Sequence, residues 1–291
     1  MYDVIIIGKG PAGISAALYT VRAKLKTLVI GKNDSVLRKA EKIENYYGFS
    51  QTVSGEFLLK EGERQASRLG THIIEDEVVS IEFNENFEVV TSSERFSCKA
   101  LLLATGQPQK KLKIANLENF EGKGISYCTT CDGFFYNNLK VGVLGFKDFA
   151  IHEAIELETY TKDITIFTNG YNLELSQGFA AELQRFKIIS KPITKVDGAE
   201  YLQRVYFEDG SGEDIEGIFV AYESASSVDF ARKLGIVIEG NSIIVDSNQQ
   251  TNLQGVFAAG DCTGGFKQIA TAVGQGAMAG KRIIEYIRGI S

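Results

Sequence analysis

Two cysteines separated by two residues are the most specific chemical signal in this sequence. They stand in the run Cys128-Thr129-Thr130-Cys131-Asp132. A Cys-x-x-Cys pair is typical of proteins that cycle between a disulfide and two thiols. If the pair opens a helix, the helix dipole lowers the pKa of one thiol and favours its thiolate. The sequence therefore predicts dithiol-disulfide chemistry at this segment.

A glycine-rich run near the N-terminus predicts a bound dinucleotide. The run Gly8-Lys9-Gly10-Pro11-Ala12-Gly13 follows an apolar stretch at residues 4–7 and opens a helix-forming stretch at residues 14–23. In such a turn Gly8 permits the sharp bend, Gly10 lets the backbone approach a pyrophosphate, and Gly13 allows close packing of helix on strand. The helix N-terminus adds N–H groups and a partial positive charge.

The run alone does not distinguish FAD from NAD(P). The next expected strand, residues 27–30, ends in Gly31-Lys32, where an acid would often hold a ribose hydroxyl. Two further segments favour FAD. They are Leu101-Leu102-Leu103-Ala104-Thr105-Gly106 and Gly255-Val256-Phe257-Ala258-Ala259-Gly260-Asp261, each a buried strand followed by a turn of small residues. Asp261 is placed to accept a hydrogen bond from a ribityl or ribose hydroxyl.

A helix is expected after Asp261, and its small residues are expected to approach a large ligand closely. These small residues are Ala270, Ala272, Gly274, Gly276, Ala277, Ala279 and Gly280.

Over nearly all its length the sequence resembles the low-molecular-weight thioredoxin reductases. The matching stretches are residues 8–13, 44–49, 104–106, 128–136, 255–261 and 268–272. The resemblance implies FAD in a domain built from both ends of the chain, a redox disulfide in an inserted domain, and a protein disulfide as substrate. The cofactor-binding residues that it implies are Gly8, Gly10, Pro11, Ala12, Gly13, Asn45, Ala104, Thr105, Gly106, Gly260, Asp261, Lys267, Gln268 and Ile269.

The same resemblance assigns roles to the catalytic residues Cys128, Cys131 and Asp132. Cys131 is expected to face the flavin, and Cys128 is expected to attack the substrate disulfide. Asp132 is expected to act as general acid-base, and a helix-capping role for it is compatible with that.

The second nucleotide fingerprint departs from the family pattern in three places. Where a glycine cluster should bind NADPH pyrophosphate, the chain reads Gly145-Phe146-Lys147-Asp148-Phe149-Ala150. The cluster of His and Arg for the 2′-phosphate is replaced by Thr168-Asn169-Gly170, and a Gly-x-x-Pro-Asn motif by residues 222–227. Three losses in one site indicate that NADPH does not bind there.

This pattern resembles a narrower group, the ferredoxin-dependent flavin thioredoxin reductases. It implies that electrons pass from reduced ferredoxin, of either the 2Fe-2S or the 4Fe-4S type, through FAD to the Cys128-Cys131 disulfide and on to thioredoxin. Three alternatives stay open: a diflavin-linked enzyme, an NAD(P)H-dependent reductase with an unconventional donor site, and a non-catalytic flavin-binding regulatory protein. The family resemblance also implies a homodimer.

The expected fold class is α/β, with two Rossmann-like, doubly wound domains. An FAD-binding domain at residues 1–111 and 241–291 is split by an inserted domain at residues 112–240. The inserted domain repeats the strand-helix-strand order at residues 141–144, 149–160 and 164–167.

The composition sets limits on partners. The net charge is -6, which disfavours nucleic acid and requires a local basic patch for an acidic ferredoxin. Three clusters are candidates, all expected in the flavin domain: Arg22-Lys24-Lys26, Arg38-Lys39-Lys42 and Lys110-Lys111-Lys113.

The remaining cysteines and the chain's hydropathy indicate a cytoplasmic redox protein. We expect Cys98 to be buried, and Cys262 either to fill a turn or to be reactive near the flavin. A single cysteine pair and two distant histidines predict no metal site. No apolar run is long enough to span a membrane, and no secretory signal is apparent.

Overall fold

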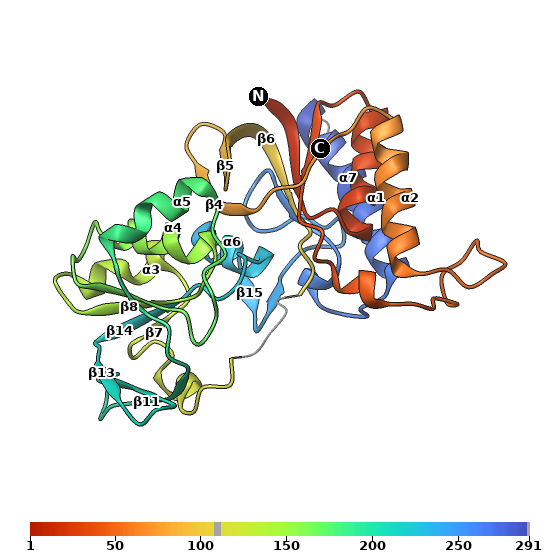
Figure 1. The fold of residues 1–291 in the computed structure, drawn as a ribbon. Helices are drawn as coiled ribbons and strands as arrows, with labels where there is room; N and C mark the ends of the chain where they lie inside the picture. The colour runs from red at the N-terminus through yellow and green to blue at the C-terminus, as the bar shows by residue number, and fades with distance from the viewer. Residues whose placement is uncertain (108–111, 290–291) are drawn as a thin grey trace. The chain divides into compact units, whose positions relative to one another are not determined.

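The chain folds into two compact units. The computed structural model describes residues 1–107 and 112–289 (Figure 1). The first unit comprises Met1–Pro108 with Ser226–Ser291, and the second comprises Gln109–Ala225. The predicted fold class, two Rossmann-like α/β domains of which one is split by the other, is confirmed.

The first unit is built on a seven-stranded sheet whose main path runs β3-β2-β1-β6-β5-β4. Strands β1, β2, β3 and β17 run parallel to β6, and β4 and β5 form an antiparallel meander. The long β6 pairs with β5 through its first half and with β17 through its second half. The bounds are β1 Tyr2–Ile7, β2 Thr27–Ile30, β3 His72–Ile74, β4 Val78–Phe83, β5 Phe87–Thr91, β6 Arg95–Leu103 and β17 Val256–Ala258.

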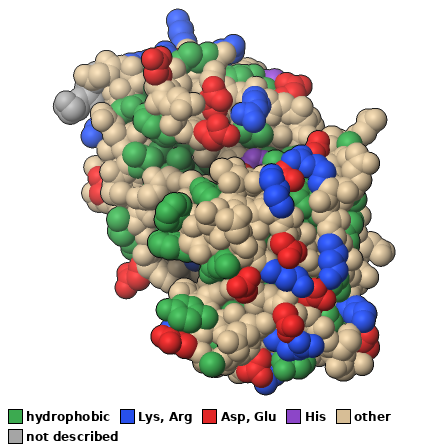
Figure 2. Space-filling model, turned by 90° about the vertical axis from the view of Figure 1, so that its left-hand side faces the viewer, with side chains coloured by type: hydrophobic (Ala, Val, Ile, Leu, Met, Phe, Trp, Pro, Cys, Tyr) green, Lys and Arg blue, Asp and Glu red, His purple; other side chains and the backbone are tan. Residues whose placement is uncertain are grey.

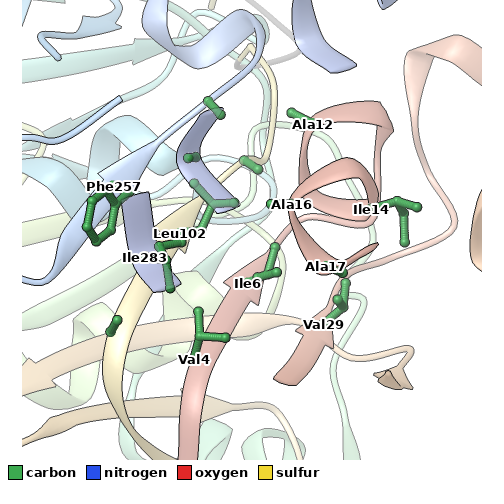
Figure 3. Packing of buried hydrophobic residues seen from close by; sticks show 14 of the residues in the cluster. Val4, Ile6, Ala12, Ile14, Ala16, Ala17, Val29, Leu102, Phe257 and Ile283 are labelled. Carbon is green, nitrogen blue, oxygen red and sulfur yellow. The ribbon is translucent and has the colours of Figure 1, made fainter. Parts of the chain in front are cut away.

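Three long helices pack around the core of this unit: α1 Pro11–Arg22, α2 Gly55–Arg68 and α7 Ile269–Arg288. In Figure 3 the side chains of Val4, Ile6 and Leu102 lie between the strands and the helices, close to Ala16 and Ile283. Strand β2 is buried over its whole length and β1 over its last four residues, which explains their continuous apolar runs in the sequence.

The small residues of α7 serve mainly helix packing. A Cβ at Gly276 would lie 2.1 Å from the Ala12 carbonyl oxygen, and one at Gly280 would lie 2.9 Å from that of Ala16. Ala272 and Ala279 are buried in the same core. The expectation that this stripe approaches a ligand is therefore corrected for these four residues, because they let α7 and α1 come into close contact.

The chain returns to the first unit earlier than the expected boundary at 240/241. Ser226 caps α6 (Ser227–Lys233) through a capping box with Asp229. Helix α6 packs against β4 and against the hairpin of β15 (Ile238–Glu239) and β16 (Ser242–Ile243). These contacts place residues 226–240 in the first unit. A local sequence pattern does not reveal them.

The second unit contains a parallel five-stranded sheet in the order β10-β9-β8-β14-β7 and a three-stranded antiparallel sheet. Its helix α4 begins one residue before the predicted helix and ends three residues before it, at Leu157. The bounds are β7 Ile125–Ser126, β8 Val141–Leu144, β9 Ile164–Phe167, β10 Lys187–Ile189, β11 Ile193–Asp197, β12 Arg204–Phe207, β13 Gly212–Asp214, β14 Gly217–Val220, α3 Thr129–Asp132, α4 Asp148–Leu157 and α5 Gln177–Glu182.

Short 3-10 helices complete the fold at η1 Val36–Lys39, η2 Leu117–Phe120, η3 Gly133–Tyr136, η4 Leu183–Arg185 and η5 Asp261–Thr263. Within residues 1–107 and 112–289, no helix combines the length and apolar character needed to cross a lipid bilayer. On the face in Figure 2, acidic and basic side chains are interspersed. A charged partner therefore has to be recognised through a local cluster there.

Candidate active site

The cysteine pair opens a short helix of the second unit. Cys128 and Cys131 form a disulfide, and Cys128 is the N-cap of α3. The backbone N–H of Cys131 donates to Cys128 Sγ over 3.1 Å. A hydrogen bond of this kind favours a thiolate on Cys128 once the disulfide is reduced. Cys128 is buried and Cys131 is exposed.

Asp132 is held beside the pair by a serine that the sequence did not single out. The Ser126 hydroxyl donates to Asp132 Oδ2 over 2.6 Å, and Ser126 Oγ accepts from the Cys128 N–H over 3.1 Å. Burial, together with the negative charge of Asp132, raises the pKa of Tyr136. Asp132 is the last residue of α3 and its side chain makes no cap hydrogen bond. The capping role, which was compatible with the sequence, is not adopted by this side chain, and the carboxylate instead faces Ser126.

The glycine-rich turn of the first unit has one open position. Gly8 has φ of 112°, and a Cβ there would lie 2.2 Å from the Ala104 carbonyl oxygen. A Cβ at Gly13 would lie 1.9 Å from the Gly8 carbonyl oxygen. At Gly10, by contrast, a Cβ would meet nothing within 4 Å. The backbone at Gly10 is therefore free for a ligand to approach, at the start of α1, where Pro11 is the first helical residue.

The other predicted cofactor residues gather at the same edge of the sheet. The parallel register brings the ends of β1, β6 and β17 together, since Leu103 pairs with both Ile7 and Ala258. The turns after these strands supply the predicted residues Gly8, Ala104, Thr105, Gly106, Gly260 and Asp261.

Hydrogen bonds hold three of these segments in place. Asn45 Nδ2 donates to Gln268 Oε1 over 2.9 Å, which joins two predicted residues far apart in the chain. The Gly260 N–H donates to Gln275 Oε1 over 2.8 Å. Lys267 is exposed just before Gln268, and Ile269 is the first residue of α7. Gln275 carried no recognisable sequence signal.

Thr105 forms hydrogen bonds with Ser227, which is the last residue of the segment that replaces the Gly-x-x-Pro-Asn motif. The two hydroxyls lie 2.8 Å apart, the Ser227 N–H donates to Thr105 Oγ1, and the Thr105 N–H donates to Ser227 Oγ. Ser227 therefore fixes the turn after β6 and belongs to the first unit.

The second fingerprint, in the other unit, is filled by its own side chains. Gly145 is retained for packing, because a Cβ there would lie 2.1 Å from the Ala221 carbonyl oxygen. Phe146 is buried and stacks on Tyr171 at 4.6 Å, with Tyr222 packed edge-on against both rings. Burial and the neighbouring Tyr171 raise the pKa of Tyr222. We call these three residues the aromatic cluster.

Two charged residues, Lys147 and Asp148, also stand where a nucleotide-binding turn would have small residues. Asp148, the first residue of α4, is buried and accepts the Ser176 N–H over 2.8 Å. Lys147 pairs with Glu174 at 3.6 Å. A buried carboxylate in the first turn repels phosphate, and the lysine charge already has a partner.

The two other cysteines are buried. Burial raises the pKa of both Cys98 and Cys262 to about 12. Cys262 Sγ donates to the carbonyl oxygens of Leu103 and Ala259 over 3.4 and 3.3 Å. The interpretation of Cys98 as a buried residue is confirmed, and the structure favours the turn-filling role for Cys262.

We therefore expect only two of the four thiols to react in the reduced, folded protein. Titration with a thiol reagent at pH 8 should count Cys128 and Cys131, since Cys98 and Cys262 stay protonated below their pKa of about 12. Unfolding in guanidinium should raise the count to four. A third fast thiol in the folded protein would show that Cys262 is reactive.

The protein has a redox-type cysteine pair at the start of a helix and a glycine-rich turn whose backbone is open to a ligand. These two features are typical of a disulfide oxidoreductase. The chain belongs to the pyridine nucleotide-disulphide oxidoreductase family, whose model matches residues 2–276. Among its curated relatives, thioredoxin reductases of Listeria monocytogenes and Rickettsia felis are 34% and 32% identical. The matches cover 99% and 98% of this chain and 94% and 97% of the relatives. The protein is thus a disulfide oxidoreductase of the thioredoxin reductase type.

Solved structures are similar over the same length. The atypical thioredoxin reductase TRi from Desulfovibrio vulgaris Hildenborough is 41% identical, with 99% of both chains covered and a TM-score of 0.96. A ferredoxin-flavin thioredoxin reductase from Clostridium acetobutylicum is 27% identical, with 99% of this chain and 98% of that one covered and a TM-score of 0.73. Thioredoxin reductase from Lactococcus lactis is 31% identical, with 99% and 100% covered and a TM-score of 0.58.

Proposed function

We propose that this protein is a thioredoxin reductase that takes electrons from reduced ferredoxin through FAD and passes them through the Cys128-Cys131 disulfide to thioredoxin. The observation that carries the proposal is the coexistence of an intact dithiol segment with a second fingerprint filled by the aromatic cluster. A similar structure named for ferredoxin and flavin supports it. The direct test is an anaerobic assay in which ferredoxin, this protein and oxidised thioredoxin are all required for thioredoxin reduction.

FAD fits the residues of the first unit. The open backbone at Gly10 and the free start of α1 suit a pyrophosphate, and the turns after β6 and β17 suit the rest of the dinucleotide. When bound, FAD supplies the link between a one-electron donor and a two-electron disulfide.

We expect Gly10→Val to lose FAD while Gly10→Ala keeps most of it. Gly10 has φ of -77° and no protein atom within reach of an added Cβ, so neither variant should strain the fold. The larger valine side chain would fill the space of the pyrophosphate. Flavin content by absorbance, with circular dichroism as a folding check, measures the effect. Full flavin content in Gly10→Val would refute this cofactor assignment.

The aromatic cluster at the second fingerprint argues against both the diflavin-linked and the NAD(P)H-dependent alternatives, and for the same reason. Phe146, Tyr171 and Tyr222 pack on one another where a second cofactor would need open backbone. A second flavin and a nicotinamide dinucleotide would each have to displace this contact and approach Asp148 with their phosphates.

The exchange chemistry follows from the geometry around α3. In the reduced protein the Cys128 thiolate, stabilised by the Cys131 N–H, attacks the thioredoxin disulfide and releases one thioredoxin sulfur as a thiol. Cys131 then attacks Cys128 Sγ, re-forms the Cys128-Cys131 disulfide and releases the second thioredoxin thiol. Two electrons and two protons thereby reach thioredoxin, and Asp132 is placed to hold a proton beside the pair. Because Cys128 is buried, the attack requires a state that exposes it.

Exposed aromatic residues next to the pair suit a protein substrate. Phe134 and Phe135 follow Asp132 within two and three residues and are 73% and 72% exposed. Aromatic side chains are enriched at the centres of protein interfaces, so these two are suited to contact thioredoxin.

The positions of the three basic clusters differ in how well they suit a ferredoxin site. Arg22, Lys24 and Lys26 lie where α1 ends and β2 begins, at the edge of the sheet opposite the cofactor turns. Strand β1 has 6 residues, so its length puts about 20 Å between the two edges of the sheet. Lys110 and Lys111 lie outside the described residues. Lys113 belongs to the second unit, which agrees with the expected inserted domain at residues 112–240 and not with the flavin-domain location expected for this cluster.

The remaining cluster follows β2 at the cofactor edge. Arg38 pairs with Glu56, whereas Lys39 and Lys42 are exposed. We therefore expect Lys39→Glu with Lys42→Glu to slow flavin reduction by ferredoxin several-fold at low salt. The matched control, Lys24→Glu with Lys26→Glu, should have little effect. The difference should shrink as salt rises, because the screening length is about 10 Å at 0.1 M. Equal effects of both pairs would contradict this docking site.

A homodimer in the cytoplasm is the remaining part of the proposal. Phe49 and Phe57 pack edge to face at 6.2 Å and are 44% and 45% exposed, and Tyr47 beside them is 98% exposed. An exposed aromatic surface of this kind suits a contact between two copies. Light scattering should give twice the chain mass.

A further inference from the structure

Helix α3, which carries the cysteine pair, is attached to a buried carboxylate. The Thr129 hydroxyl donates to Glu153 Oε2 over 2.6 Å. Thr129 is 1% exposed and Glu153 is 2% exposed. Thr129 stands directly after Cys128, and Glu153 lies in the middle of α4, which packs against α3. This contact connects the redox segment to the helix behind it.

Glu153 lies within a group of polar and titratable side chains. His152 Nδ1 lies 3.7 Å from Glu153 Oε1 and 3.7 Å from Glu156 Oε1. A buried carboxylate is costly without a hydrogen-bond donor, and the Thr129 hydroxyl supplies one. Asp132, next to Cys131, faces Ser126. Helix α5, which also packs on α4, carries Glu182. Among the described strands that pack on α4, β8 and β9 contain only uncharged residues.

We propose that Glu153 is a positioning residue for the redox pair, acting through Thr129 in two ways. Its hydrogen bond holds the first turn of α3, so that the Cys131 N–H stays aimed at Cys128 Sγ. Its negative charge behind the pair opposes ionisation of Cys128. The first effect favours the Cys128 thiolate and lowers its pKa, whereas the second disfavours the thiolate and raises the pKa. The pKa of Cys128 therefore lies between the values that either effect alone would give. The proposal rests on the dithiol chemistry of the proposed function and involves neither electron donor nor thioredoxin.

The two effects can be separated by two near-isosteric substitutions. Glu153→Gln keeps an oxygen that accepts from Thr129 and removes the charge. Thr129→Val keeps the shape and the charge of Glu153 and removes the hydrogen bond. We expect Glu153→Gln to lower the pH midpoint of Cys128 alkylation by about one unit and Thr129→Val to raise it by about half a unit. Thr129→Ser, which retains the hydroxyl, should match the unaltered protein.

The experiment uses the flavin-loaded protein, reduced and desalted under nitrogen. Iodoacetamide is added across pH 5 to 10, and peptide mass spectrometry follows Cys128. Cys98 and Cys262, whose pKa is raised by burial to about 12, serve as internal blanks. Flavin content and melting temperature show whether each variant folds. A merely structural contact would change those two values and leave the midpoint of the folded protein unchanged.

Opposite shifts for Glu153→Gln and Thr129→Val support the proposal. Unchanged midpoints, or shifts of the same sign, overturn it. Because the assay contains only the protein and iodoacetamide, a failure of ferredoxin to act as donor does not affect its result.

Discussion

Reduced ferredoxin is expected to bleach the bound flavin quickly under nitrogen, whereas NADPH and NADH at millimolar concentration leave it oxidised. The physical reason is the second fingerprint, where Phe146 stacks on Tyr171 and Asp148 is buried in the first turn of α4. A loss of about 3 kcal/mol in nucleotide binding weakens affinity about 100-fold. Flavin absorbance, recorded by stopped flow with each donor in turn, measures the difference.

The control for this experiment is a conventional NADPH-dependent thioredoxin reductase assayed with the same reagents. It should be reduced by NADPH, which shows that the nucleotide is active. If NADPH alone reduces the flavin of this protein rapidly, the ferredoxin proposal fails. The protein would then be a nicotinamide-dependent reductase with an unfamiliar binding site.

Cys131→Ser should abolish turnover and accumulate a stable mixed disulfide between Cys128 and thioredoxin. With the resolving thiol removed, the intermediate formed by Cys128 cannot be released from within the pair. The N–H of residue 131 remains to stabilise the Cys128 thiolate, so the first attack is preserved. After incubation with oxidised thioredoxin, non-reducing electrophoresis should show a band of the mixed disulfide. This band should disappear when a thiol reductant is added.

Cys128→Ser is the matched variant. It leaves Cys131 as the single sulfur of the pair, and Cys131 is the exposed member in this structure. If Cys128→Ser accumulates the adduct and Cys131→Ser does not, the two roles are reversed and accessibility outweighs thiolate stabilisation.

Much of the fold follows from local sequence patterns. The strands at residues 27–30, 141–144 and 164–167 were predicted with their observed bounds, because each is a short apolar run buried on both faces. The sequence left open whether the cysteine pair begins a helix, and the structure shows that it does. In such segments the secondary structure of each residue is determined by its immediate neighbours in the sequence.

Contacts between distant segments were not predictable. The bond from Thr105 to Ser227 joins residues 122 positions apart, and the bond from Thr129 to Glu153 joins two helices. Loss of the glycines at the second fingerprint was visible, but Tyr171 and Tyr222 have no motif that shows they fill the same space. Helix packing also explains glycines such as Gly276 that a ligand seemed to require.

The hydrogen bonds between Thr105 and Ser227 bear on how such a chain arose. They bring the point where the chain leaves the first unit next to the point where it returns. A whole domain can therefore be inserted there without separating any strands of the host sheet. The same proximity makes the site suitable for engineering. A linker of a few residues across it would turn the first unit into a free-standing flavodomain, and a foreign domain with closely spaced ends could be grafted in its place.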